Sequence, residues 1–298
     1  MHSVTDKPPF INVNGQVLPA DAPAFGALDR GLLYGDGLFE TLRAYDGVPF
    51  LLEEHLARLN ASAAELRISD GLDRSLLARN TAELLRLNAL ADAYIRITLT
   101  RGLHRGRLEV EPTDRPTVCI VARPLRPLPP SRYDPGTSAV VASIRQNADS
   151  PLPRHKTLNY LANLLAKTEA RERGADEAIL LNTRGEVAEA ASSNLFLVRE
   201  GRLVTPPLSA NILPGVTRAE VLRLAAEAGL IAEERLVLPD ELHAAAEVFL
   251  TNSVAELVPV RAIGERPVGA GTPGPITRQL HAAYRRRVET YRETVSAV

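Results

Sequence analysis

The segment Arg-Pro-Leu-Arg-Pro-Leu-Pro-Pro at residues 123–130 decides how the fold of this 298-residue chain is read. Proline fixes φ and has no N–H to donate, so four prolines in eight residues are not expected inside a helix or a central strand. We therefore predict an interdomain linker at 123–132, between an N-terminal domain of residues 1–122 and a C-terminal domain of residues 133–298. An ordinary long surface loop is the alternative.

Residues 1–122 are predicted to mix helices and strands. Asn14-Gly15 and Asp46-Gly47 are dipeptides typical of tight hairpin turns, and leucines at helical spacing follow the second of them. The expected elements are a hairpin at 11–18, a hairpin at 38–52, helices at 53–66 and 76–87, and strands at 93–100 and 117–122.

Residues 133–298 show the same mixture. A turn at Glu200-Gly201 separates two apolar runs, and a strongly helical segment ends near Gly229. The expected elements are strands near 138–143 and at 177–181, 194–198, 202–205 and 247–251, and helices at 159–173, 216–228 and 277–291. Both halves therefore predict a mixed α/β fold.

Composition excludes several classes of protein. Apolar residues make up 45%, charged residues 24%, and the net charge is −1, so no general attraction for nucleic acid or an acidic membrane is expected. The single cysteine, Cys119, can form neither an internal disulfide nor a thiolate metal cluster, and we predict no metal site and a cytoplasmic location. Residues 1–9 lack the apolar core of a signal peptide, and no apolar run reaches the roughly 18 residues of a membrane helix.

Lysine is rare, and only Lys7, Lys156 and Lys167 occur among 35 basic residues. Lys7 lies in a polar tail, and Lys167 lies in a predicted helix off its Leu161-Leu164-Leu165 stripe, so both are expected in solvent. Lys156 follows a proline-containing loop and precedes a helix, where an amine can point into a cleft. Burial and nearby cations make such an amine a nucleophile toward carbonyl groups. A surface lysine is the alternative.

Two features suit a phosphate group. Residues 213–218 open a helix whose free N–H groups bind anions, and the Thr217 hydroxyl could add a bond, although Thr217 with Glu220 also fits a capping box. Arg58 on the first long helix has paired N–H donors for phosphate, with a solvated side chain as the alternative. Gly35-Asp36-Gly37 is not a nucleotide loop, because it precedes a strand and no Gly-Lys-Ser/Thr follows.

Seven sequence blocks in a fixed order favour functional roles for Lys156, Arg58 and Thr217 over the alternatives given above. The blocks are Gly35-Asp36-Gly37-Leu38-Phe39-Glu40-Thr41, His55-x-x-Arg58-Leu59, Lys156-Thr157-Leu158-Asn159-Tyr160, Gly174-Ala175-Asp176-Glu177-Ala178, Glu189 with Ser193-Asn194-Leu195-Phe196, Leu213-Pro214-Gly215-Val216-Thr217-Arg218 and Thr251-Asn252-Ser253. Together they resemble the class IV aminotransferases from about residue 11 to residue 288. The resemblance implies the two-domain α/β fold type IV of pyridoxal 5′-phosphate (PLP) enzymes, similar to D-amino-acid aminotransferase.

The resemblance also implies roles for single residues. Lys156 would carry PLP as a Schiff base and move the substrate's α-proton. Glu189 would pair with the pyridine nitrogen, and a carboxylate there keeps that nitrogen protonated so that the ring accepts electrons. The phosphate and the ring hydroxyl would be bound by Arg58, Tyr160, Val216, Thr217, Asn252 and Ser253.

On the substrate side, the resemblance implies a small amino compound and a homodimer. The loop at 100–107 would reach the neighbouring site, where Arg105 would hold a substrate carboxylate; a solvated basic loop is the alternative. Tyr34, Phe39 and Arg96 are further substrate candidates. Thr41 is a candidate catalytic hydroxyl that could assist proton delivery.

Three branches of the family compete. The branched-chain branch usually has Phe-Glu-Gly in place of Phe39-Glu40-Thr41 and Gly-Glu-Asn in place of residues 192–194, whereas lyase-like members have residues that match Thr41 and Asn252. The D-amino-acid branch has a tyrosine in place of Leu32. The motifs thus favour 4-amino-4-deoxychorismate lyase, which releases pyruvate and gives 4-aminobenzoate. The alternatives are an aminotransferase acting on a D- or branched-chain amino acid and a 2-keto acid, and a phosphate-binding module without catalysis.

Overall fold

A computed structural model describes residues 9–113 and 115–296, so Lys7 lies outside the described residues. The chain forms two compact units. Unit 1 is drawn from residues 1–126, 156–158 and 291–298, and unit 2 from residues 127–155 and 159–290. The boundaries expected around a linker at 123–132 stay a prediction. Within the described ranges, no helix is long and apolar enough to cross a lipid bilayer.

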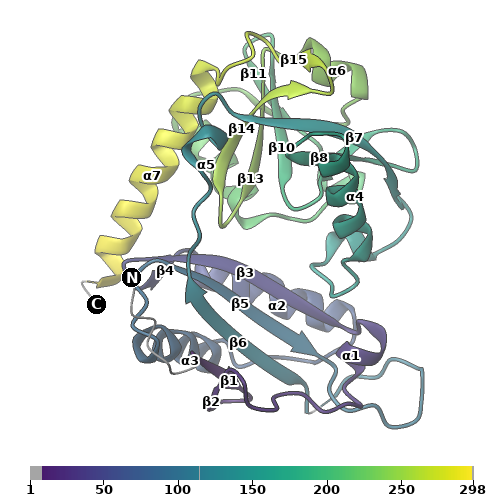
Figure 1. Ribbon diagram of the computed structural model, residues 1–298, viewed down its shortest axis with the longest axis vertical. Helices are drawn as coiled ribbons and strands as arrows, with labels where there is room; N and C mark the ends of the chain where they lie inside the picture. Colours follow the sequence, from purple (N-terminus) through teal and green to yellow (C-terminus); the bar gives the residue numbers. More distant parts are fainter. Residues whose placement is uncertain (1–8, 114, 297–298) are drawn as a thin grey trace. The chain divides into compact units, whose positions relative to one another are not determined.

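Unit 1 contains an antiparallel sheet that has six strands within the described residues, in the order β2-β1-β6-β5-β3-β4 (Figure 1). Both expected hairpins are confirmed, and Asn14 and Asp46 have the positive φ values that their turns require. The strands are β1 (Phe10–Val13), β2 (Gln16–Pro19), β3 (Gly37–Tyr45), β4 (Val48–Pro49), β5 (Ala93–Thr100) and β6 (Thr117–Pro124).

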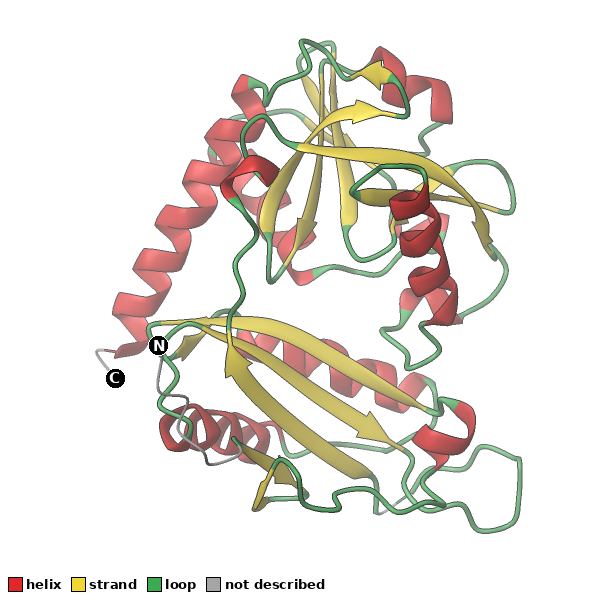
Figure 2. Cartoon of the chain, in the orientation of Figure 1, coloured by secondary structure: helices red, strands yellow, loops and turns green. Residues whose placement is uncertain are grey.

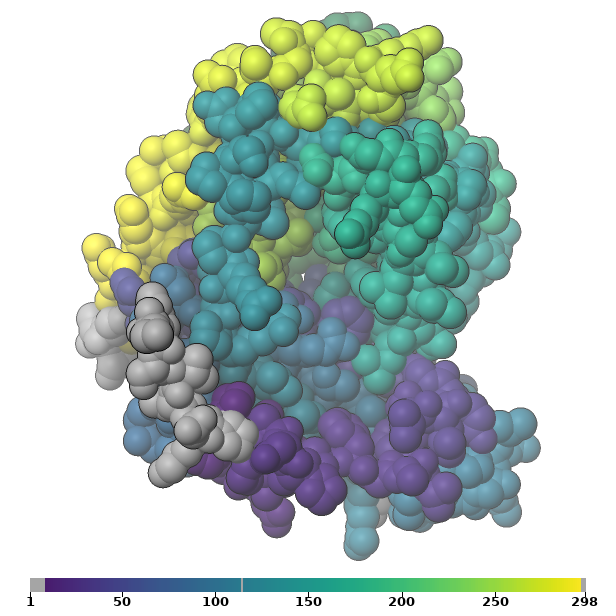
Figure 3. All heavy atoms as spheres, in the orientation of Figure 1, coloured from purple at the N-terminus to yellow at the C-terminus, as the bar shows by residue number. Residues whose placement is uncertain are grey.

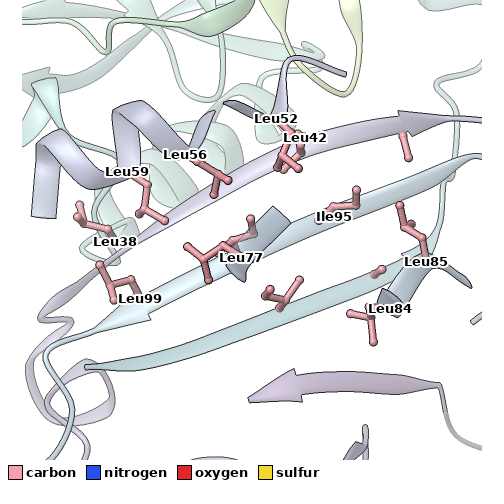
Figure 4. Close-up of a cluster of buried hydrophobic side chains, with 14 of the residues drawn as sticks. Leu38, Leu42, Leu52, Leu56, Leu59, Leu77, Leu84, Leu85, Ile95 and Leu99 are labelled. Atoms are coloured by element: carbon pink, nitrogen blue, oxygen red, sulfur yellow. The ribbon is translucent and has the colours of Figure 1, made fainter. Parts of the chain in front are cut away.

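Helices α2 (Leu52–Glu65) and α3 (Arg74–Leu87) supply the core of unit 1 with the sheet. Side chains alternate along β3, so Leu38, Leu42 and Ala44 share the face that packs against these helices. Figure 4 shows the leucines of α2 directed toward this face. Burying each leucine stabilises the fold by about 1.5–3 kcal/mol, and the opposite sheet face is left for polar side chains.

Strand β6 continues two residues further than expected. Arg123 and Pro124 were expected to lie outside any central strand, but they pair with Tyr94 and Ala93 of β5. Pairing of β6 with β1 on its other side ends at Val121. Pro124 therefore sits where β6 has a neighbour on one side only, and its missing N–H costs no ladder hydrogen bond there.

Unit 2 is built on a mixed sheet with nine strands among the described residues, in the order β12-β11-β10-β13-β14-β7-β8-β9 with β15 paired to β14 (Figure 1). Among the described residues, three strand pairs of this sheet are parallel, namely β7 with β8, β7 with β14 and β11 with β12, and its other pairs are antiparallel. The strands are β7 (Thr137–Gln146), β8 (Glu177–Asn182), β9 (Val187–Ala190), β10 (Asn194–Arg199), β11 (Arg202–Thr205), β12 (Ala232–Glu234), β13 (Glu247–Asn252), β14 (Glu256–Ile263) and β15 (Arg266–Pro267).

The helices of unit 2 appear red in Figure 2. They are α4 (Leu161–Glu172), α5 (Val216–Glu227), α6 (Pro239–Ala244) and α7 (Pro275–Ser296), with short 3₁₀ turns η1 (Pro130–Arg132), η2 (Leu152–Arg154) and η3 (Leu208–Ala210). From residue 291 on, α7 is counted with unit 1. A short helix α1 (Arg30–Tyr34) belongs to unit 1; Asp29 caps its start, and Gly35 ends it in the left-handed conformation. The predicted mixed α/β class is confirmed.

Helix α4 packs differently from its expected amphipathic pattern. It buries Ala166 and Ala170 against β7 and β8, whereas Leu161, Leu164 and Leu165 are 66%, 57% and 51% exposed. Small alanines let the helix approach the sheet closely, so the leucine stripe is turned outward. Figure 3 shows the teal-green α4 segment at the molecular surface. Lys167 is half-exposed as expected, and its ammonium is paired with the Glu177 carboxylate at 2.5 Å.

Candidate functional site

Lys156 lies in a short segment that pairs with strand β3. The Phe39 N–H donates to the Lys156 carbonyl at 2.8 Å, and the Leu158 N–H donates to the Gly37 carbonyl at 2.9 Å. A Cβ at Gly37 would lie 2.8 Å from a Leu158 methyl group and 2.4 Å from the Leu99 carbonyl oxygen, so glycine is needed for this close approach. The lysine is thereby fixed to a strand of unit 1.

The ring of Phe39 brings two cations together. The Lys156 ammonium lies 4.6 Å from the ring centroid, and the Arg96 guanidinium carbon lies 3.9 Å from it. Arg96 donates to the Thr98 hydroxyl at 3.2 Å, and no described carboxylate forms an ion pair with its guanidinium. Thr41 is the register partner of Arg96, so its half-buried side chain lies on the same sheet face. This face combines an amine, a guanidinium available to an anion, and a hydroxyl.

Arg58 is held by a buried carboxylate on the other face of β3. Its Nε and Nη2 atoms donate to the two oxygens of Glu40 at 2.8 and 2.6 Å, and His55 Nδ1 lies 2.7 Å from Glu40 Oε2. Burial alone would raise the pKa of Glu40, but the Arg58 charge and the His55 hydrogen bond outweigh it and lower the pKa to about 2. Burial lowers the pKa of His55. Glu40 therefore fixes the plane of the Arg58 guanidinium.

The loop that contains Arg105 is anchored by two buried arginines. Arg30 and Arg101 both donate to the Asp36 carboxylate through Nε, at 2.7 and 2.8 Å. Other N–H groups of the two arginines donate to main-chain carbonyls in the loop, at Arg107, Leu108 and Glu111. Arg101 also donates to Asp36 Oδ1 and to the carbonyls of Leu66 and Arg67, which lie outside the loop. Burial would raise the pKa of Asp36, but the bonds from both arginines lower it.

Arg105 itself is exposed, and so is Tyr34 at the end of α1. The Tyr34 ring meets the His104 ring edge-on, with 5.5 Å between the ring centroids, and the Arg30 guanidinium lies 5.2 Å from the Tyr34 centroid. Tyr34 and the loop are thus neighbours in unit 1, and the substrate roles of Tyr34 and Arg105 stay predictions.

Glu189 lies in strand β9 of unit 2. Its carboxylate is buried and accepts hydrogen bonds from amide groups. Oε2 accepts from Asn194 Nδ2 at 3.1 Å and from the Leu213 N–H at 3.3 Å, and Oε1 accepts from Gln146 Nε2 at 3.5 Å. Neutral donors on both oxygens orient this carboxylate in a water-poor environment.

The start of α5 is open to an anion. Its N-cap is Gly215, no side chain caps the first turn, and the capping box expected from Thr217 and Glu220 is wrong because Thr217 already lies inside the helix. Uncapped N–H groups and the helix dipole attract negative charge. Thr217 Oγ1 lies 3.3 Å from Ser253 Oγ in the turn after β13, so two hydroxyls meet near Val216, the first helical residue.

Asn252 and Tyr160 make local bonds in unit 2. Asn252 Oδ1 accepts from the N–H groups of Val254 and Ala255 at 3.0 and 2.7 Å, so its amide shapes the turn that carries Ser253. The Tyr160 hydroxyl donates to the Ala191 carbonyl at 2.9 Å.

These donors fit PLP. Thr251 Oγ1 is buried and has no hydrogen-bond partner within the described part of the chain, and Thr251 is the register partner of Asn194 in β10. An unsatisfied buried hydroxyl, an uncapped helix start and a buried carboxylate together suit a ligand with a phosphate and a basic ring nitrogen.

Sequence reasoning assigned no role to Glu40, His55 or Asn194. A detectable signal existed for Glu40, because the alternation of β3 places it between Leu38 and Leu42 on the core face, where a charge requires a partner. No such signal existed for Asn194, because its bonds to residues in other segments depend on folding.

Comparisons with known proteins agree with this geometry. The family model for amino-transferase class IV matches residues 37–263. The chain is 41% identical to a protein of Methanocaldococcus jannaschii named "Putative branched-chain-amino-acid aminotransferase", with 92% of this chain and 95% of that protein covered. It is 36% identical to a D-alanine aminotransferase of Bacillus licheniformis, with 91% and 94% covered.

Solved structures of similarly named enzymes also resemble this chain. A branched-chain amino acid aminotransferase of Escherichia coli superimposes with a TM-score of 0.87 at 33% identity, over 93% of this chain and 94% of that one. A Legionella pneumophila protein titled "Putative 4-amino-4-deoxychorismate lyase" superimposes with a TM-score of 0.82 at 26% identity, over 90% and 96%. The predicted fold type is therefore confirmed.

Proposed function

Because this chain belongs to the class IV aminotransferase family, whose enzymes use PLP, we propose that it transfers an amino group between an amino acid and a 2-keto acid. One observation carries the proposal. Lys156 and Arg96 lie against the same Phe39 ring, which brings an amine and a guanidinium that could receive a substrate carboxylate next to one aromatic side chain. A branched-chain donor is proposed first, since relatives of that name reach 41% identity.

The proposed roles follow from the local contacts. Lys156 attaches PLP covalently and then moves the proton of the substrate α-carbon. When bound, PLP supplies an electron sink for the charge left on that carbon. Glu189 would pair with the pyridine nitrogen, and the phosphate and ring hydroxyl would be held by Arg58, Tyr160, Val216, Thr217, Asn252 and Ser253. Substrate is contacted by Phe39, Arg96, Tyr34 and Arg105.

The lyase reaction is a second candidate, and Thr41 is the observation that favours it. Its hydroxyl lies on the same face as Phe39 and Arg96, at a position where branched-chain members usually have glycine. A hydroxyl there could deliver a proton as pyruvate leaves. The chain is 26% identical to the Legionella pneumophila protein named as a lyase, which is lower than the 41% and 36% identity to the two aminotransferases, so the lyase reaction is placed second.

The test is a side-by-side assay of the PLP-loaded enzyme. L and D forms of leucine, valine, alanine and glutamate are offered with 2-oxoglutarate or pyruvate, and aminodeoxychorismate is offered without a keto acid. Turnover that requires both an amino donor and a keto acid supports the aminotransferase. If the enzyme releases pyruvate from aminodeoxychorismate with no keto acid added and shows no transamination, the lyase replaces the aminotransferase as the proposed function. Lys156→Ala should abolish either reaction, and Lys167→Ala is the matched control.

We also propose that the enzyme is a homodimer in the cytoplasm. The outward-facing Leu161, Leu164 and Leu165 of α4 form an apolar stripe that a second copy could cover. The lone Cys119 is buried in unit 1, and its thiol has a raised pKa because of burial, which suits a chain that forms no disulfide. Sedimentation of the wild type and of Leu164→Glu tests the assembly.

A further inference from the structure

The amide of Asn194 connects two parts of unit 2. Its Nδ2 donates to Glu189 Oε2 at 3.1 Å and to the Leu213 carbonyl at 2.9 Å. The Leu213 N–H in turn donates to the same Glu189 oxygen at 3.3 Å. Asn194 thus ties the buried carboxylate of β9 to the segment that leads directly into α5.

Gly215 shows how closely Asn194 approaches the start of α5. A Cβ built on Gly215 would lie 1.9 Å from Asn194 Oδ1 and 3.1 Å from its Cγ. The backbone of Gly215 has φ −67° and ψ 132°, which any residue can adopt, so glycine is required here for space and not for conformation. The amide of Asn194 occupies the volume that the side chain of residue 215 would need.

We propose that Asn194 is a positioning residue that fixes the Glu189 carboxylate against the start of α5. The inference rests on the proposed role of Glu189 at the pyridine nitrogen and of α5 at the phosphate. PLP is rigid, so the carboxylate and the uncapped helix start must be held at one fixed separation. Asn194 sets that separation through one bond to each part, and Gly215 makes room for it.

Substitutions of Asn194 and Gly215 should have non-additive effects on PLP binding. Asn194→Ala removes the donor to Glu189 and should weaken PLP binding by roughly tenfold, the usual effect of losing a hydrogen bond to a charged group. Gly215→Ala should weaken it by at least as much, because the new methyl group displaces the Asn194 amide. In the double variant the methyl group has space, so PLP binding should be no weaker than in Gly215→Ala alone.

Asn194→Asp keeps the size of the side chain and replaces its donor by an oxygen. This change places a second negative charge beside Glu189, which should turn the Glu189 carboxylate away and change the absorption maximum of bound PLP. The variant preserves the test if Asn194→Ala folds poorly. The matched control is Asn182→Ala, which removes another buried asparagine with an Asn–Glu bond, at 2.8 Å to Glu186. It should lower the melting temperature and leave PLP affinity and absorption unchanged.

The experiment measures PLP dissociation constants and absorption spectra for the wild type and all five variants, with borohydride reduction to locate PLP. A non-additive loss of affinity with an altered spectrum supports the inference. A different result would be that borohydride traps PLP on Lys156 while the Asn194 variants have the same PLP affinity and absorption spectrum as Asn182→Ala. That result overturns the positioning role of Asn194 and leaves the proposed function intact. Absence of PLP on Lys156 in the wild type overturns the proposed function and the inference with it.

Discussion

The Arg58 guanidinium holds the Glu40 carboxylate by two parallel hydrogen bonds, Nε to Oε1 at 2.8 Å and Nη2 to Oε2 at 2.6 Å. Glu40 is 1% exposed and Arg58 is 11% exposed, so both charges are removed from water. Such a pair fixes a side-chain plane more firmly than a surface ion pair does. The phosphate-binding role proposed for Arg58 therefore depends on Glu40.

Glu40→Gln should destabilise unit 1 strongly. The variant leaves the buried Arg58 charge without a carboxylate, and breaking a buried pair in this way costs about 3–5 kcal/mol. Urea unfolding of the PLP-free protein measures the loss. Glu53→Gln on α2, the helix that carries Arg58, is the matched control, because the Glu53 side chain is exposed and its loss should change stability by less than about 0.5 kcal/mol. Equal stability of the two variants would show that the pair contributes nothing.

Stability should fall with acid because of Glu40. Its folded pKa of about 2 lies below the ordinary value of 4.5, so its stabilising effect is fully present above pH 4.5 and is lost as the pH falls toward 2. The difference in unfolding free energy between the wild type and Glu40→Gln should shrink by roughly 3 kcal/mol over that window. Taking the difference also removes the parallel acid sensitivity of Glu256, whose pKa is lowered to about 2. A difference that stays constant with pH would contradict this assignment.

Arg96→Gln should impair substrate binding while PLP stays bound. Removal of a charged hydrogen-bond donor for the substrate carboxylate should lower kcat/KM by about 10- to 100-fold. Arg123→Gln is the matched control, since Arg123 is also stacked on a ring of the same sheet face, 4.4 Å from the Tyr94 centroid. If both variants keep wild-type kinetics, Arg96 is not the carboxylate receptor.

Asp36→Asn should loosen the loop that contains Arg105. The change removes the shared counter-charge of Arg30 and Arg101, whose N–H groups hold the loop carbonyls. Limited proteolysis between residues 103 and 111 should become roughly tenfold faster. Asp92→Asn, which affects an exposed pair with Arg43 at 3.6 Å, should leave the cleavage rate unchanged. Unchanged cleavage in Asp36→Asn would mean that other contacts hold the loop.

Local signals in the sequence predicted much of the fold. The turn at Asn14-Gly15 located the first hairpin, and alternation located β5 with its observed bounds. Strand β14 was missed because Pro259 lies within it. Pro259 pairs with Phe249 of β13, and the pairing with β7 starts one residue later, at Val260, so proline is tolerated at this point.

The sequence pointed to candidate site residues but not to the residues that hold them. Lys156 and Glu189 became candidates because the order of the motifs resembles one family, and their roles stay predictions. Asn194 and Gly215 were quoted within those motifs, but the contact between them appears only when β10 and the start of α5 are brought together. Sequence alone also gave the wrong orientation for the leucine stripe of α4, because a helical pattern does not tell which face meets the sheet.

The central claim is that the amine of residue 156 carries PLP. Purified protein loaded with PLP is reduced with borohydride, digested with trypsin and analysed by mass spectrometry. The account predicts a phosphopyridoxyl adduct on Lys156, in a peptide of residues 155–167 that trypsin no longer cleaves at residue 156. An unmodified Lys156, or an adduct found on Lys7 or Lys167 in its place, would contradict the account.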